Sequence, residues 1–261
     1  MYYFETPIYL IIAAALWVTG LILISFKSKK IVRAIGHSML ILGIIVLAVY
    51  IFVIPEFILK TPFYADDKPL LQYSVLIPVI SYIIYLKQKF KWLLYLAITA
   101  SLALLAGHYF FLPALPAKIV RTEYQNIWYL PHIILNKLSY VIFSVSFITS
   151  LYGLKFHPKK VLDNINLTVN WLIYAGFSFL IFGIILGVVW ANQTLGKYWV
   201  WETRECWAIF IFFVYLTYIH IRNFYPQYIK LNLWIAVFAF VLIITVWVII
   251  NYYPGFSLVF F

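Results

Sequence analysis

The sequence predicts an all-α integral membrane protein, a single bundle of about eight transmembrane helices over residues 1–261 with both termini on the external face. Of its 261 residues, 66% are hydrophobic and only 10% are charged, whereas an ordinary globular domain is roughly half apolar and about a quarter charged. Apolar runs such as Leu231 to Tyr253 recur along the chain, and a bilayer is crossed by about 20 helical residues. Both observations exclude a water-soluble fold.

Apolar windows between polar breaks place the spans one after another. The first window runs from Pro7 to Phe26, and it is interpreted as a membrane span because no small-residue cleavage site follows it. The third and seventh windows are the shortest. The predicted spans cover residues 7–26, 37–57, 70–86, 92–111, 132–154, 169–191, 207–221 and 231–253.

Basic residues are divided unevenly between alternate connections. Twelve lysines and arginines follow the first, third, fifth and seventh spans, and six follow the second, fourth and sixth. The positive-inside rule therefore places both termini and the longer connections, 60–69, 112–131 and 192–206, outside. Short juxtamembrane loops against anionic lipid account for the net charge of +11, so the expected partner of these residues is membrane lipid and not nucleic acid.

Several classes of chemistry are excluded by what the sequence lacks. Its single cysteine, Cys206, rules out an internal disulfide and a metal site built from several thiolates. A glycine-rich phosphate loop and an internal repeat are both absent from the sequence, which argues against a nucleotide-driven machine and an inverted-repeat transporter.

The external connection 190–207 concentrates aromatic and charged residues. Four tryptophans lie within eighteen residues, together with a glycine at the bend and interspersed charges: Trp190, Gly196, Trp199, Trp201, Glu202, Arg204, Glu205 and Trp207. An aromatic belt at the headgroup layer would explain any one of these tryptophans. A belt needs neither the glycine nor the packed charges, and such a surface suits a planar aromatic ligand at the bilayer edge.

This segment resembles the tryptophan-rich WWD domain of the CcsA (also ResC) family, the membrane subunit of the System II cytochrome c synthase. The resemblance is carried by Trp-Val-Trp-Glu-Thr-Arg-Glu-Cys-Trp-Ala at 199–208 and Tyr-Ile-His-Ile-Arg at 218–222. It is specific over about residues 190–222 and architectural elsewhere. Leu195-Gly196 stands in place of the family's Trp-Gly, and Glu202 in place of an aspartate.

The resemblance implies a role in cytochrome c biogenesis, in which the chain binds b-type haem transiently and presents it on its external face. The residues implied to bind the cofactor are Trp190, Gly196, Trp199, Trp201, Glu202, Arg204 and Trp207. No residue is expected to be catalytic beyond positioning haem. The implied partners are a CcsB/ResB-type membrane subunit and apocytochrome c with its CxxCH segment. The implied location is the bacterial cytoplasmic membrane, or the thylakoid membrane for a plastid chain.

Histidines are the expected iron ligands, because an imidazole within a membrane is costly and is a common haem ligand. His132, at the outer start of the fifth span, resembles the family's external haem histidine, and a helix-start residue at the interface is the alternative. His220 resembles the family's intramembrane haem histidine. The family's second external histidine is absent near Phe256, so His108 is a further candidate outside, and His37 is a further candidate on the inner side.

Two rival functions remain open at this point. A haem transporter or HemX-like haem-handling membrane protein would carry the same fold without ligase activity, and the missing histidine near Phe256 favours it. A scaffolding subunit would use its tryptophans only as a belt.

Overall fold

The computed structural model describes residues 8–25, 30–58, 69–111, 126–155, 158–199, 201 and 203–252. These residues form eight helices that are long and apolar enough to cross a membrane, which confirms the predicted fold class and number of spans. Helices are expected because hydrocarbon offers no water to backbone N–H and C=O groups, and a helix satisfies them within one segment. The side on which the termini lie stays a prediction.

The chain divides into two compact units, residues 1–120 and 121–261. The first unit contains α1 (Ile8–Ser25), α2 (Lys30–Ala48), the π-helix η1 (Val49–Ile58), α3 (Pro69–Gln88) and α4 (Lys91–Phe111). Helix α1 pairs with α2 and α3 pairs with α4, while contacts of α2 with α3 and of α1 with α4 join the two pairs.

Small residues bring α1 and α2 close together. A Cβ atom on Gly20 would lie 2.8 Å from the carbonyl oxygen of Gly36, and one on Gly43 would lie 2.7 Å from the indole of Trp17. The Trp17 side chain is fully buried. Because lipid tails are as apolar as the side chains, such close packing supplies the attraction between membrane helices.

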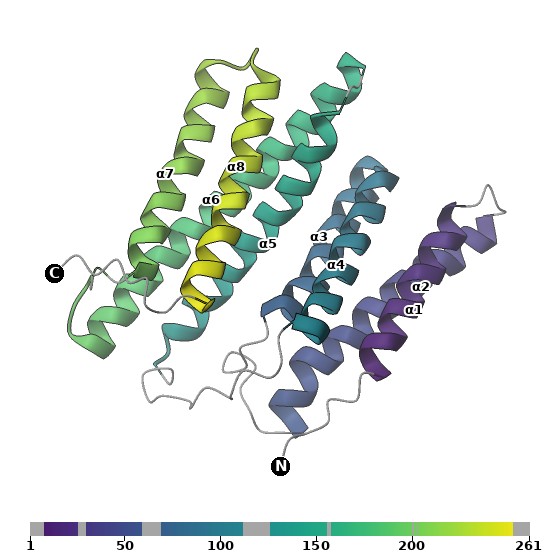
Figure 1. The fold of residues 1–261 in the computed structure, drawn as a ribbon, viewed down its shortest axis with the longest axis horizontal. Helices are drawn as coiled ribbons and strands as arrows, with labels where there is room; N and C mark the ends of the chain where they lie inside the picture. The colour runs from purple at the N-terminus through teal and green to yellow at the C-terminus, as the bar shows by residue number, and fades with distance from the viewer. Residues whose placement is uncertain are drawn as a thin grey trace. The chain divides into compact units, whose positions relative to one another are not determined.

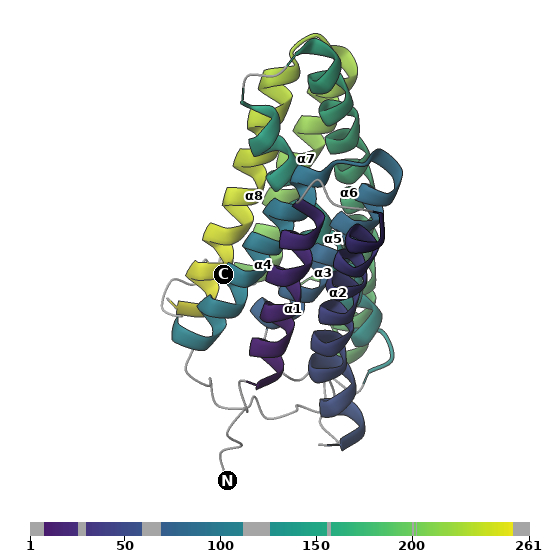
Figure 2. The ribbon, with the colours of Figure 1, turned by 90° about the vertical axis from the view of Figure 1, so that its right-hand side faces the viewer.

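The second unit is a four-helix arrangement of α5 (Tyr129–Gly153), α6 (Lys159–Leu195), α7 (Thr203–Phe224) and α8 (Ile229–Tyr252). Each helix contacts the next, and α8 contacts α5, so the four close into a bundle. The α5–α6 and α7–α8 turns lie at one end of this unit, and the starts of α5 and α7 lie at the other (Figures 1 and 2).

Aromatic rings interlock the centre of this bundle. The rings of Phe143 and Tyr215 stack at 3.6 Å between centroids and join α5 to α7. The same Phe143 ring occupies the place of a side chain on α6, because a Cβ on Gly176 would lie 2.6 Å from it. Phe147 and Phe240, 5.0 Å apart, join α5 to α8.

Helix α6 is longer than predicted, with 37 residues from Lys159 to Leu195 against the predicted span 169–191. Its first turns are amphipathic, with Lys159, Lys160 and Asp163 exposed while Ile165 is buried. A search for continuous apolar windows leaves such an amphipathic segment out of the predicted span, although its apolar face packs in the bundle. At the other end, Asn192 to Leu195 belong to the helix and not to the external connection.

Helix α2 also differs from its predicted span, because it begins at Lys30 and not at residue 37. It continues into the π-helix η1, which contains Pro55. A proline has no N–H to donate to the preceding turn, and wider π-type turns are one way a membrane helix accommodates this loss.

The two-sided arrangement of the connections can be tested by cysteine labelling in a Cys206→Ser background. Cysteines placed at Lys68, Lys118 and Lys197 should react with an impermeant maleimide in intact cells, because the positive-inside bias places these residues outside. Those at Lys29, Lys89 and Lys159 should react only after permeabilisation. Equal labelling of the two groups in intact cells would contradict the predicted topology.

Candidate functional site

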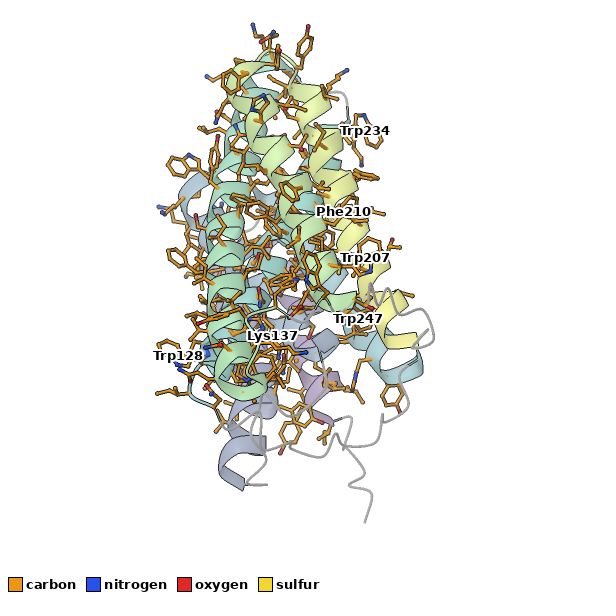
Figure 3. The ribbon with its side chains drawn as sticks, turned by 90° about the vertical axis from the view of Figure 1, so that its left-hand side faces the viewer. Trp128, Lys137, Trp207, Phe210, Trp234 and Trp247 are labelled. Carbon is orange, nitrogen blue, oxygen red and sulfur yellow. The ribbon has the colours of Figure 1, made fainter. Side chains whose placement is uncertain are left out.

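The start of α5, the connection after α6 and the start of α7 lie at the same end of the second unit (Figures 1 and 2). Figure 3 shows Trp128, Lys137, Trp207 and Trp247 in this half of the unit, whereas Trp234 lies towards the other end. The structure therefore brings the region of His132 and the tryptophan-rich connection to one end of the bundle.

His132 is half-buried in the first turns of α5 and faces α6. Its Nδ1 atom lies 2.7 Å from the carbonyl oxygen of Gly183 and 3.2 Å from the side-chain nitrogen of Asn136. A carbonyl oxygen can only accept, so Nδ1 carries the hydrogen and donates it to Gly183. In the neutral ring the lone pair then lies on Nε2, which makes no hydrogen bond to any described residue.

The Trp190 indole stands beside this imidazole. The two rings are nearly parallel, with an angle of 7° and 6.2 Å between centroids. Tyr129 lies 5.4 Å from the same indole. Tyr129 and His132 are three residues apart on α5, so one face of that helix meets Trp190.

Glycine ends α6 and opens the tryptophan-rich connection. Gly196 has the left-handed φ of +69°, and its N–H donates to the Asn192 carbonyl at 3.1 Å. Beyond it, Trp201 also has a left-handed φ, +58°. Such a φ is uncommon for a residue with a side chain, and here it precedes the start of α7. The thiol of Cys206 lies 3.7 Å from the Trp201 carbonyl oxygen.

The tryptophans of the connection differ in exposure. The Trp201 side chain is 56% exposed and meets Trp199 edge-on at 6.1 Å. Trp199 and Trp207 are half-buried, and their indole nitrogens are fully buried without a hydrogen-bond partner among the described residues. Trp207 also contacts Phe210 at 5.7 Å. Two buried indole N–H groups at this end of the bundle therefore lack a hydrogen-bond acceptor among the described residues.

The charged residues of the connection are only partly described. Glu202 lies outside the described residues. Arg204 belongs to the first turn of α7, but its side chain lies outside them. Glu205 stands in the same turn, where a carboxylate complements the positive end of the helix dipole.

His220 lies near the other end of α7, away from the tryptophan-rich connection. Its imidazole is exposed and contacts Phe224 at 4.5 Å. Tyr218, two residues earlier, points into the bundle and donates to Asn170 at 2.5 Å. The structure therefore separates His220 from His132 and places it on an outward face of α7.

The two lower-ranked histidines belong to the first unit. His37 stacks on Tyr85 at 5.3 Å, and its Nε2 lies 3.3 Å from the Tyr85 hydroxyl. His108 is half-buried in the last turn of α4. Over the described ranges no three His, Cys, Asp or Glu side chains converge as a metal site, whereas haem iron needs only one or two protein ligands.

Three residues of the site were not predicted from the sequence: Asn136, Gly183 and Gly187. A Cβ on Gly187 would lie 2.6 Å from the His132 ring, and Gly183 supplies the carbonyl that anchors it. The four-residue spacing of the two glycines is a known signal of close helix packing. The sequence alone, however, does not say which histidine lies against them.

The chain matches the family model described as "Cytochrome C assembly protein" over residues 6–256. Three curated relatives are each named "Cytochrome c biogenesis protein CcsA". The Cyanidium caldarium protein is 31% identical over 211 residues, which cover 79% of this chain and 63% of the relative. The Chlamydomonas reinhardtii protein is 33% identical over 38% of this chain and 30% of the relative. The Oenothera argillicola protein is 33% identical over 43% of this chain and 34% of the relative.

The chain therefore spans about a third of the length of the first curated relatives it matches and 63% of the Cyanidium caldarium protein. The match to the family model, in contrast, extends over nearly the whole chain.

Gly196→Ala should destabilise the protein by about 1 kcal/mol, because a Cβ is disfavoured at a left-handed φ. Among the described residues, no atom beyond the two chain neighbours lies within 4 Å of the added methyl group, so the cost arises from the backbone alone. The free energy of unfolding in mixed detergent micelles measures it.

Gly107→Ala is the matched control. Gly107 is helical, and a Cβ there would make an ordinary 3.8 Å contact with Leu70, so this change should be neutral or stabilise the protein by about 0.5 kcal/mol. Equal unfolding free energies for the two variants would contradict a left-handed end of α6.

Proposed function

Because this chain belongs to the cytochrome c assembly protein family, we propose that it binds haem at the outer end of α5–α8 and presents it for covalent attachment to apocytochrome c. The observation that carries the proposal is His132. Its Nδ1 is held by the Gly183 carbonyl, which leaves the Nε2 lone pair available, and this is the arrangement of a histidine that ligates a metal.

Donors at the same end of the second unit as His132 fit the rest of a haem. Haem carries two propionate carboxylates, and the buried indole N–H groups of Trp199 and Trp207 lack an acceptor among the described residues. A buried donor without a partner costs about 1–3 kcal/mol, so a carboxylate at this place would relieve two such costs. Trp190, parallel to the His132 ring, supplies a flat apolar surface beside the ligand.

When bound, haem supplies the iron that His132 would ligate and the vinyl groups to which the cysteine thiols of a CxxCH segment add. The chain's own residues would position haem and shield it from water. His132 would fix the iron axis, Trp199 and Trp207 would orient the carboxylates, and the surrounding rings would exclude water, which favours productive geometry over side reactions.

Among the described residues of α5–α8, His132 is the only histidine at this end of the unit. The family's second external histidine is absent near Phe256, a position outside the described residues. His108, in the last turn of α4, stays the candidate that the sequence offers, and a haem with two histidine ligands would be six-coordinate and low-spin.

We propose that His220 belongs to a different haem site. It stands on the exposed side of α7 together with Phe213 and Phe224, which are 55% and 68% exposed. We place an inner haem site there, shared with a membrane subunit of the CcsB/ResB type, because an imidazole on an outward face needs a neighbour to complete its ligation. His37, whose Nε2 faces Tyr85, is the alternative ligand on that side.

A haem transporter of the HemX-like kind is the second candidate function. The missing histidine near Phe256 favours it, because a single ligand holds iron poorly and would suit release more than attachment. This reading keeps the same His132 site but predicts no covalent product.

Co-expression with a CcsB-type subunit and a CxxCH-bearing reporter should yield covalently haem-bound reporter, together with a low-spin haem spectrum in the purified membrane protein. His132→Ala should abolish the labelled reporter and the low-spin signal of the outer haem while leaving that of a haem bound at His220, and external imidazole should partly restore the outer signal because it supplies the same donor atom. Haem staining of the denatured reporter and absorption spectroscopy are the measurements.

Trp234→Ala, at the opposite end of α8, is the control and should change neither readout. Bound haem without labelled reporter would select the transporter. A wild-type protein without haem would leave the tryptophans as a belt on a scaffolding subunit.

Replacing Trp199 or Trp207 by Phe keeps a ring and removes the N–H donor. Each change should weaken haem binding about tenfold, the worth of a hydrogen bond to a charged group. Binding of haem dimethyl ester, which has no carboxylate charge, should change little. Trp201→Phe is the matched control, since its indole is 56% exposed. Equal losses for haem and its ester would contradict recognition of carboxylates by these indoles.

A further inference from the structure

Helices α5 and α6 meet along three matched positions. The glycines of α6 at 176, 183 and 187 lie against Phe143, Asn136 and His132 of α5, respectively. The steps of seven and four residues run in opposite directions on the two helices, as antiparallel packing requires. Each glycine therefore makes room for one particular side chain of α5.

We propose that Gly183, Gly187 and Trp190, called here the α6 seat, are positioning residues that select the Nδ1–H tautomer of His132 and fix the plane of its ring. The proposal rests on the haem-binding function proposed above and deepens it. It names the residues that determine which nitrogen faces the iron and in which direction.

The tautomer follows from a competition at Nδ1. Gly183 offers a carbonyl oxygen at 2.7 Å, which demands a hydrogen on Nδ1, whereas the Asn136 amide nitrogen at 3.2 Å would demand a lone pair there. Nδ1 cannot carry a hydrogen and a free lone pair at once, so only one of these two contacts can be a hydrogen bond. The shorter contact, to the Gly183 carbonyl, would be repulsive without the hydrogen. The Asn136 amide can instead turn its oxygen towards Nδ1, because its two ends are interchangeable in space.

The ring plane follows from the missing side chains. A Cβ on Gly187 would lie 2.6 Å from Cε1 and 2.7 Å from Nδ1 of His132, so alanine there would push the ring away. A Cβ on Gly183 would lie 2.9 Å from Cγ and 3.3 Å from the backbone nitrogen of Asn136, so alanine there would separate the helices. The ring therefore lies directly on the α6 backbone, parallel to Trp190 within 7°.

Simple helix packing is the competing explanation, and the same interface supplies its control. Gly176 accommodates the Phe143 ring at the same 2.6 Å, but that ring carries no ligand atom. Alanine at 176 and alanine at 187 thus create similar clashes between the same two helices. Only the clash at 187 involves an imidazole.

The experiment compares Gly187→Ala with Gly176→Ala in the full-length protein. The first readout needs no haem: two-bond ¹⁵N–¹H correlation spectra of histidine-labelled protein in nanodiscs, with the His132 signal assigned by its loss in His132→Gln. Wild type and Gly176→Ala should show the Nδ1–H tautomer. Gly187→Ala should show a mixture of the two tautomers.

The second readout is the bound haem. Gly187→Ala should weaken haem binding about 10- to 100-fold, the usual effect of changing a residue that orients a metal ligand, and imidazole should restore the low-spin spectrum. Gly176→Ala should keep wild-type affinity. Asn136→Asp provides a variant without added bulk. Its carboxylate should take the Nδ1 hydrogen bond and lower the haem reduction potential, because it makes the ligand more basic.

The outcomes separate the two proposals. Equal effects of the two alanines on the His132 signal, or no effect of Gly187→Ala on it, would overturn the α6 seat whatever the protein does with haem. A wild-type protein that shows the Nδ1–H tautomer, with Gly187→Ala disrupting it, supports the seat even when no haem is bound, and in that case the haem-binding function alone fails.

Discussion

Hydrocarbon cannot hydrogen-bond, and most of this architecture follows from that constraint. Each crossing must be a complete helix, because exposed N–H and C=O groups inside the bilayer would each cost several kcal/mol. Irregular backbone is therefore left to the ends of helices. The left-handed Gly196 and Trp201, together with Trp199, lie in the connection after α6. A ligand of this protein would meet its adaptable backbone only at such an end.

Close packing through glycine recurs in both units but with different consequences. In the first unit Gly20 and Gly36 bring the backbones of α1 and α2 together, and Gly43 receives the buried Trp17. In the second unit the same device receives an imidazole beside a backbone carbonyl. A glycine contact therefore becomes part of a site when the residue opposite it carries a ligand atom, and the backbone oxygen it exposes becomes a usable acceptor.

The two ends of the second unit differ in their chemistry. At the end that carries His132, one imidazole nitrogen is anchored and two indole N–H donors are buried. Around His220 the imidazole points outwards, while the neighbouring Tyr218 is bonded inside the bundle to Asn170. The first arrangement can hold a ligand within one chain. The second leaves its imidazole exposed at the surface of the helices.

Hydropathy and charge by themselves determined the all-α membrane fold, the number of spans and most of their limits, because the cost of placing a residue in hydrocarbon is local and additive. They missed the amphipathic first turns of α6, whose buried face is visible only once its neighbours are in place. The motif at 199–208 and the helix-start His132 also indicated that the site lies at one end of the helices. Only the tertiary structure decided that Gly183 and Gly187 lie against His132 and that His220 faces outwards. Such contacts depend on helix rotation and register, which arise from many weak packing terms between distant segments, and no local pattern encodes them.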